Sequence, residues 1–464
     1  MSSIEEQINA VTTSLLPDAP FDRRFGPKAN LDERMLFHKT PGISIAVVNN
    51  CEIAWARGFG VREWGNPEPI QEDTVFQAGS ISKPIFALAV MRLVEEGRLD
   101  LDRDVNQYLR SWKVPATAGW QPRVTLRQLL THSAGLTVHG FPGYLRSEPI
   151  PSVPQVLDGA PPANTGPVLV NIIPGTQHRY SGGGTTIGQQ VLVDVLDTPF
   201  PQIMRELVLD PLDMTNSTYE QPLPPAWEHR AATAHPWQYQ KVNGNWHVYP
   251  EMAAAGLWST ATDLAKAGLA LQRIRRGETG LLKQATVEQM LTPQIGDSMG
   301  IGFFLFGKNA GRRFGHGGWD EGFTADVAFS FDGGYGAVVM INSNQGNSLL
   351  YEVGRAIGTV YDWPDFLDAD PATVEVAPDI LQTYCGAYQL REGYEGKVAA
   401  TDDGLTLQVG QQAPLSMVAI SETKFQVSGL NAQIEFTKDN DGAVTGFRLT
   451  QNDAPIEANK VERT

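Results

Sequence analysis

The residues from Ser82 to Glu96 form the most constraining stretch of the sequence, because their pattern is helical and apolar almost all the way round. Gly97 follows directly, and glycine is the residue that most often ends a helix. A helix with no polar face must be covered by other elements on every side. We therefore predict that this helix lies at the centre of a globular domain.

Ser80 and Lys83 stand three positions apart where this helix starts. If the helix begins near Ser80, residues i and i+3 share one face, and the amine can approach the hydroxyl. The helix N-terminus favours developing negative charge, and apolar surroundings favour a neutral lysine that can act as a base. A serine activated in this way attacks a carbonyl carbon and forms an acyl-enzyme. The same pair is compatible with a serine that only caps the helix and a lysine that extends towards solvent.

Tyr180 belongs to a second chemically suggestive stretch, "PGTQHRYSGGGTTIGQQ", in which Tyr180, Ser181 and Gly182 lead from a loop into a helix. A tyrosine beside a lysine can carry a proton as a phenolate, because the neighbouring positive charge stabilises the ionised form. The alternative is a tyrosine that only packs in a glycine-rich turn.

His316 opens a third stretch, "HGGWDEGF", within a predicted β-meander over residues 299–343. Glycines inside a strand, here Gly317 and Gly318, often mark the close approach of a ligand or of another backbone. A backbone N–H at or just after these glycines, together with the N–H of Ser80, can stabilise an oxyanion. A glycine bulge between two strands is the competing interpretation.

The bulk composition narrows the class of protein. A chain of 464 residues is long enough for two or three domains, and a net charge of −16 disfavours nucleic-acid binding. The first residues lack the pattern of a secretory signal, and no stretch is apolar enough for a membrane span, so a cytoplasmic location is expected. Cys51 and Cys385 do not suggest a disulfide framework.

No metal or cofactor is expected from the sequence. The histidines do not fall at metal-ligand spacing, and the glycines at 182–184 lack the lysine of a phosphate-binding loop. An α/β-hydrolase elbow is also disfavoured, because "THSAG" and "RYSGG" both lack its first glycine. Residues 138–175 are rich in proline and glycine without clear periodicity, which is typical of a lid or binding region.

The three stretches, in this order, resemble the serine β-lactamase and penicillin-binding protein superfamily. The similarity is greatest to the class C β-lactamase-like branch, which also holds D-aminopeptidases, DD-peptidases and family VIII carboxylesterases. The phrases "FQAGSISK", "LRQLLTHSAGL" and "GLWSTATDLAK" add to this resemblance, which covers residues 35–360. The tail that begins "PDILQTYCGAYQL" looks like the lipocalin-like barrel often appended to these hydrolases.

The resemblance implies an α+β, β-lactamase/transpeptidase-like fold: an antiparallel sheet flanked by helices, with a helical lobe, followed by a small all-β barrel. We predict a serine hydrolase domain over residues 1–363, an acidic, proline-punctuated linker over 364–377, and the barrel over 378–464.

The same resemblance assigns the site. Ser80 matches the family's nucleophile, and Lys83 and Tyr180 match the groups that share its proton. His316 takes the position of the third motif's lysine or histidine, with Gly317 and Gly318 behind it. The N–H groups of Ser80 and Trp319 match the oxyanion hole.

Three departures from the family pattern bear on the substrate. Gly182 replaces an asparagine that would hold a substrate's acylamino group. His316 replaces the lysine of many β-lactamases and is less reliably charged at neutral pH, which weakens a carboxylate anchor. The sequence also lacks an E-x-x-L-N stretch for activating a deacylating water.

The expected function is therefore hydrolysis of a small ester, or of a peptide or amide, through an acyl-Ser80 intermediate, with β-lactam hydrolysis weak. A small molecule or short peptide is the expected substrate, and the barrel offers a surface for homo-oligomer formation. A non-hydrolytic, penicillin-binding-like sensor is the alternative. The presence of all three of Ser80, Lys83 and Tyr180 disfavours it.

Overall fold

The computed structural model describes residues 3–16, 28–307, 311–364, 374–391, 394–401, 404–410, 414–427, 432–439, 441–451 and 454–461. The chain divides into two compact units, which are described separately below. The first unit comprises residues 1–8 and 35–346, and the second comprises residues 9–34 and 347–464.

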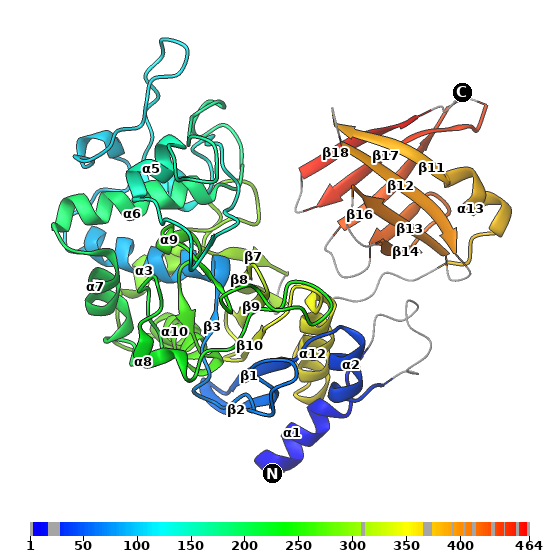
Figure 1. The fold of residues 1–464 in the computed structure, drawn as a ribbon, viewed down its shortest axis with the longest axis horizontal. Coiled ribbons are helices and arrows are strands. Elements are labelled where there is room, and N and C mark those ends of the chain that lie inside the picture. The colour runs from blue at the N-terminus through cyan, green and yellow to red at the C-terminus, as the bar shows by residue number, and fades with distance from the viewer. Residues whose placement is uncertain are drawn as a thin grey trace. The chain divides into compact units, whose positions relative to one another are not determined.

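A six-stranded antiparallel sheet is the framework of the first unit, with the strand order β2-β1-β10-β9-β8-β7 (Figure 1). Strands β1 and β2 form the hairpin at one edge, and β7 to β10 form the meander that the alternation of strand-like runs and glycine-rich turns predicts. The strands are β1 (Gly42–Asn49), β2 (Glu52–Gly60), β7 (Phe304–Phe306), β8 (Arg313–Asp320), β9 (Phe323–Ser330) and β10 (Gly336–Ile341).

Helix α3 (Ser82–Glu95) is central, as its apolar pattern predicts. Most of its residues are buried, including Lys83, and Gly97 takes the left-handed conformation just beyond its end. Helix α10 (Ala261–Arg275) packs on β1, β2, β9 and β10. Gly268 of α10 makes this contact close, because a Cβ there would lie 2.2 Å from the Phe329 ring.

The remaining elements of the first unit are mostly short. The helices are α4 (Leu126–Leu130), α5 (Val153–Asp158), α6 (Gly182–Leu196), α7 (Phe200–Met204), α8 (Pro225–Glu228), α9 (Met252–Ala255) and α11 (Gln284–Met290). Two small sheets pair β3 (Phe76–Gln77) with β6 (Trp258–Ser259), and β4 (Tyr144–Leu145) with β5 (His247–Val248).

The segment 138–175, in which the sequence shows no clear periodicity, contains the regular elements β4 and α5. Helix α6 begins at Gly182, where the sequence predicts that the loop carrying Tyr180 leads into a helix. Close packing explains the glycines at this helix start: a Cβ on Gly183 would lie 2.8 Å from a methyl group of Val168.

The N-terminal helices α1 (Ile4–Thr12) and α2 (Leu31–Phe37) precede β1 in the chain. In the second unit, Arg34 of α2 forms a buried two-pronged ion pair with Glu352 of α12 (Asn347–Val360), with N–O distances of 2.7 and 2.5 Å. Two parallel hydrogen bonds of this kind fix both partners in orientation.

The C-terminal residues form a closed eight-stranded barrel, which confirms the predicted small all-β fold (Figure 1). Helix α13 (Pro378–Tyr384) precedes it, and the Tyr384 ring stacks on Phe436 in the barrel core at 4.2 Å. Residues 365–373 of the predicted linker lie outside the described residues, so its boundaries stay a prediction. The strands are β11 (Gly386–Arg391), β12 (Tyr394–Thr401), β13 (Gly404–Val409), β14 (Leu415–Ala419), β15 (Lys424–Val427), β16 (Ala432–Lys438), β17 (Val444–Gln451) and β18 (Ala454–Val461).

Among the helices that the structure describes, none combines the length and the apolar character needed to cross a bilayer.

Candidate active site

Ser80 lies in a 3₁₀ turn, Gly79–Ile81, that runs directly into α3. Gly79 has φ of +51°, and a Cβ there would lie 2.5 Å from the backbone nitrogen of Trp319, so the position requires glycine. The Ser82 hydroxyl secures the turn, donating to Gly79 O at 2.6 Å and accepting from the N–H of Leu257 at 3.0 Å. The serine is thus presented from a rigid bend.

Lys83 lies in the first turn of α3, and its side chain is buried beside the serine. Its Nζ donates to Ser80 Oγ at 2.9 Å and to Ala254 O at 2.8 Å. Burial lowers the pKa of Lys83 from 10.5 to about 7, and the charge of Asp320 opposes this shift. A substantial fraction of the amine is therefore neutral near pH 7 and can accept a proton.

Tyr180 lies immediately before Ser181 in the chain. The Ser181 side chain caps α6 by accepting a hydrogen bond from the N–H of Gly184 at 3.0 Å. The Tyr180 ring centroid lies 5.0 Å from Lys83 Nζ, and the phenol lies close enough to Ser80 for that side chain to favour its ionised form. Burial of the hydroxyl raises the pKa of Tyr180 above its usual 10, and the interaction with Ser80 opposes the shift only in part. The resting tyrosine is therefore a neutral phenol rather than the phenolate that a neighbouring lysine alone would favour.

His132 and His139 flank Tyr180, and the sequence did not indicate either as part of this site. Their rings lie 4.2 and 4.8 Å from the Tyr180 ring. His132 holds the tyrosine's chain on both sides, since its carbonyl accepts from the N–H of Arg179 at 2.7 Å and its Nδ1 accepts from the N–H of Ser181 at 3.2 Å. Burial and the charge of Lys83 lower the pKa of both imidazoles, so both are neutral at physiological pH.

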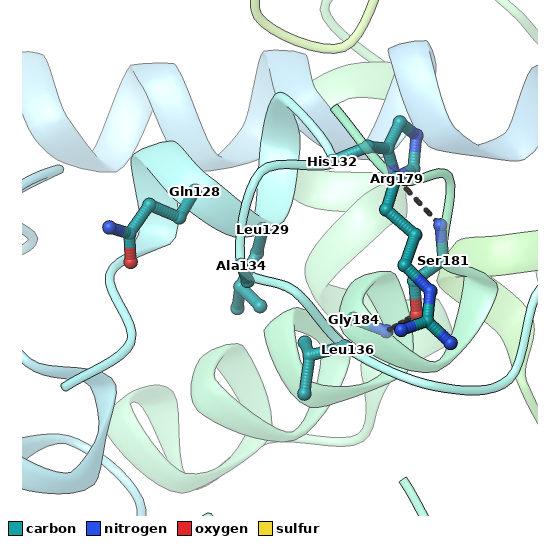
Figure 2. Close-up of a pocket in the computed structure, with 8 residues that line it drawn as sticks. All are labelled: Gln128, Leu129, His132, Ala134, Leu136, Arg179, Ser181 and Gly184. Carbon is teal, nitrogen blue, oxygen red and sulfur yellow. Dashed lines mark hydrogen bonds between the residues drawn. The ribbon is translucent and has the colours of Figure 1, made fainter. Parts of the chain in front are cut away.

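A narrow gap lies behind this loop, between α4, α6 and the chain around His132 (Figure 2). Leu129, Leu136 and Ser181 are among the residues that line it. The gap is too small to hold a water molecule, so we interpret it as a packing defect rather than a ligand site.

His316 is buried on β8, with its ring 6.1 Å from Tyr180 and 5.0 Å from Phe304. Its Nδ1 lies 2.6 Å from the carbonyl oxygen of Gly317 and donates to it, because a carbonyl can only accept. Burial and the charge of Lys83 lower the pKa of His316 to about 3. This histidine is therefore neutral and cannot supply the positive charge of a lysine at this position.

The glycine-bearing part of β8 lies directly against the serine turn. A Cβ on Gly318 would lie 2.1 Å from Ala78 O, whereas a Cβ on Gly317 would make only an ordinary contact, 3.8 Å from Asp326 Oδ1. Strand β7 pairs with β8 only as far as Gly315, so the rest of β8 presents a free edge on that side within the described residues. The backbone N–H of Trp319 lies on this segment, next to the turn that carries Ser80. Two N–H groups near one hydroxyl are what an oxyanion hole requires.

Asp320 and Glu251 are further buried groups near this site that the sequence analysis missed. Strand alternation gave a usable signal for Asp320, because it shares a face of β8 with His316 and Gly318. Glu251 had no such signal, because it precedes a helix of only four residues.

A family model described as Beta-lactamase matches residues 28–360. The chain belongs to the β-lactamase family. The chain is 36% identical to esterase EstB of Burkholderia gladioli over 129 residues. This aligned region covers 28% of this chain and 30% of the esterase. The chain is 22% identical over 441 residues to penicillin-binding protein 4* of Bacillus subtilis, which covers 88% of this chain and 92% of the relative.

Two solved structures share the fold of this β-lactamase-family chain. An octameric penicillin-binding protein homologue from Pyrococcus abyssi has a TM-score of 0.60 and 22% identity, covering 92% of this chain and 98% of the other. A D-alanine carboxypeptidase AmpC from Burkholderia cenocepacia has a TM-score of 0.56 and 18% identity, and the match covers 76% of this chain and 99% of the other. The predicted β-lactamase/transpeptidase-like fold is confirmed, and the family and its relatives indicate a hydrolase of the serine β-lactamase and penicillin-binding protein type.

Proposed function

We propose that this protein is a serine hydrolase that acts on small esters or on peptide or amide bonds through an acyl-Ser80 intermediate. The observation that carries the proposal is the 2.9 Å hydrogen bond between Lys83 Nζ and Ser80 Oγ, made by a buried amine whose pKa is lowered to about 7. A base near the working pH, in contact with the nucleophile, is the arrangement that covalent catalysis needs.

In the acylation step, Ser80 Oγ forms a bond to the substrate's carbonyl carbon while its proton passes to neutral Lys83. The N–H groups of Ser80 and Trp319 stabilise the resulting oxyanion. The Tyr180 phenol then gives its proton to the departing oxygen or nitrogen as the carbon–leaving group bond breaks, and the Lys83 ammonium returns a proton to Tyr180. Water releases the acyl group from Ser80 by the same route in reverse.

The environment of the site favours esters and simple amides over β-lactams. The family's substrate carboxylate would meet a neutral His316, and Gly182 offers no side-chain amide for an acylamino group. The Burkholderia relative is named as an esterase, and the AmpC neighbour as a D-alanine carboxypeptidase. An ester or a D-residue amide is therefore the substrate class that we propose.

The proposal is tested by covalent labelling with a fluorophosphonate and by a parallel screen of p-nitrophenyl esters, D-amino acid p-nitroanilides and nitrocefin. Ser80→Ala should abolish both labelling and turnover, whereas the exposed Ser147→Ala should retain both. Labelling that survives in Ser80→Ala would place the nucleophile elsewhere. An unlabelled parent protein with neither a burst nor steady turnover would favour the non-hydrolytic sensor.

Self-association through the barrel is a separate proposal. The Pyrococcus relative is described as octameric. Light scattering of the full chain should give a multiple of the monomer mass, and a monomer at all concentrations would contradict this proposal.

A further inference from the structure

Five aromatic rings form an accessible row beside the proposed catalytic groups. Phe306 and Phe304 of β7 have ring centroids 6.3 Å apart. The Phe304 ring lies 6.3 Å from both Tyr180 and His178, and it is nearly parallel to the Tyr180 ring, with an angle of 10° between them. The His139 ring lies 4.8 Å from Tyr180. We call Phe306, Phe304, His178, Tyr180 and His139 the aromatic strip.

The strip is open to solvent, although it lies next to a buried core. Phe306 and His139 are exposed, and the other three members are half-buried. Strand alternation explains the two phenylalanines, because Leu305 between them is buried in the core and leaves Phe304 and Phe306 on the opposite face of β7. A contiguous apolar surface is typical of a place where a ligand or a partner binds.

One member of the strip, Tyr180, is the proposed acid for the leaving group. Its ring centroid lies 5.0 Å from Lys83 Nζ, and its phenol lies close to Ser80. In the mechanism proposed above, Tyr180 protonates the departing atom, so the group attached to that atom must lie against Tyr180 when the bond breaks. The acyl oxygen is directed instead to the N–H groups of Ser80 and Trp319. The rings that continue from Tyr180, above all Phe304, are therefore placed for the leaving group.

The strip offers a flat apolar surface without a fixed positive charge. Partial desolvation of the rings lowers the pKa values of His139 and His178, so both imidazoles are neutral at physiological pH. Arg179 lies next to Tyr180 in the chain, but its guanidinium hydrogen-bonds with Asn171. An aromatic group stacks favourably on such rings, whereas a carboxylate placed against them loses hydration without meeting a cationic partner.

We propose that the aromatic strip is the leaving-group subsite, and that Phe304 selects an uncharged aromatic leaving group over one that carries a carboxylate. The inference rests on the function proposed above and deepens it, because it favours aryl esters over peptides with a free C-terminal carboxylate.

The proposed reaction with an aryl ester balances as follows from the groups present. Ser80 Oγ forms a bond to the acyl carbon and passes its proton to neutral Lys83. The bond from that carbon to the aryl oxygen breaks, and this oxygen takes the Tyr180 proton and departs as a phenol. The Lys83 ammonium then returns a proton to Tyr180. The aryl ring stays against Phe304 throughout, so its stacking lowers the barrier to acylation.

Three acetate esters measure the selectivity. The p-tolyl and p-(carboxymethyl)phenyl esters release phenols of similar basicity and differ in charge, whereas trifluoroethyl acetate has no ring. The parent protein should prefer p-tolyl acetate to the carboxymethyl analogue by roughly tenfold or more in kcat/KM. Equal values, or a preference for the carboxylate, would overturn the proposal.

Phe304→Ala removes the ring next to Tyr180. It should lower kcat/KM for p-tolyl acetate by roughly tenfold and leave that for trifluoroethyl acetate within about twofold, because only the aryl ester stacks on the strip. Phe304→Leu keeps apolar volume without a ring and decides the matter if the alanine variant does not fold. It should lower the ratio of tolyl to trifluoroethyl activity by roughly threefold. An unchanged ratio in a folded variant would contradict the proposal.

A cation introduced into the strip provides the opposite test. Phe306→Arg changes a side chain that is 39% exposed, and it should raise the ratio of carboxymethyl to tolyl activity by roughly threefold at low salt. Phe37→Arg is the matched control, because Phe37 is 38% exposed and lies on α2, outside the strip. The control should keep the ratio of the parent. An equal rise in both variants would assign the effect to net charge and reject the role of the strip.

Binding is measured separately in Ser80→Ala, which cannot form the acyl intermediate, by saturation-transfer NMR of the intact esters. Stronger transfer to p-tolyl acetate than to its carboxymethyl analogue, lost when Phe304→Ala is added, would retain the strip even in a protein without turnover and reject the proposed function alone. Turnover that depends on Ser80 but not on Phe304 or Phe306 would retain the function and reject the strip. Neither turnover nor binding would reject both.

Discussion

Gly79 and Trp319 touch backbone to backbone, so closely that a Cβ on Gly79 would lie 2.5 Å from the Trp319 nitrogen. This contact joins the turn carrying Ser80 to the strand that carries the second N–H donor. The spacing between the proposed nucleophile and the proposed oxyanion hole therefore depends on a glycine to which we assign no chemical role.

Gly79→Ala should lower kcat/KM by roughly 10²-fold, because an added methyl group must push β8 away from the serine turn. Gly97→Ala is the matched control, since Gly97 also has positive φ but has no atom within 4 Å of a new Cβ. It should cost about 1 kcal/mol of stability and leave kcat unchanged. Steady-state kinetics and thermal unfolding separate the two effects, and equal kinetics in both variants would contradict this interpretation.

Tyr180→Phe should lower kcat by roughly 10²-fold or more, the usual scale for loss of an acid–base group. The ring and its packing against His132 and His139 are retained, so the unfolding temperature should change little. The variant should still react with a fluorophosphonate, although more slowly. A rate equal to that of the parent would remove Tyr180 from the mechanism.

The pH dependence of kcat/KM should follow the neutral form of Lys83. Because burial lowers the pKa of Lys83 to about 7, activity should be high above this pH and fall progressively below it. His316 cannot cause this limb, because its pKa lies near 3. A profile that stays flat from about pH 9 to about pH 5 would rule out Lys83 as the base.

Glu251→Gln should change how stability depends on pH. Burial raises the pKa of Glu251 from 4.5 to about 8, so its protonated form contributes stability that is complete below pH 4.5 and lost as the pH rises through 8. The Tm values of variant and parent should therefore be similar in acid, and the variant should be more stable above pH 8. Exposed Glu220→Gln should show no such divergence.

The elements that short-range pattern determines were predictable from the sequence. The apolar circumference of α3 indicated burial, and Ser80 and Lys83 were related by helical spacing alone. The place of Tyr180 beside them followed from resemblance, because almost a hundred residues separate it from Lys83 and no periodicity connects the two. The C-terminal barrel was expected from the resemblance of the tail to the lipocalin-like barrels of related hydrolases.

What sequence could not supply was the effect of burial on charge. The alternation of β8 places Asp320 inward, but only the packed structure shows that it faces the serine turn and that Glu251 approaches from another segment. The same holds for Tyr180, because its enclosure, which the sequence does not show, raises the pKa of the phenol. The segment 138–175 gave no periodic signal because its strand and helix, β4 and α5, are only two and six residues long.

The glycine triplet that begins α6 limits how this site can be changed. New Cβ atoms at Gly182 and Gly183 would meet Phe141 at 3.0 Å and Val168 at 2.8 Å. An asparagine at 182, introduced to recruit acylamino substrates, would therefore press on the Phe141 ring and on His139 O, which lies 3.1 Å from such a Cβ. Redesign for β-lactams must begin with a smaller side chain at 141, before position 182 can accept a larger residue.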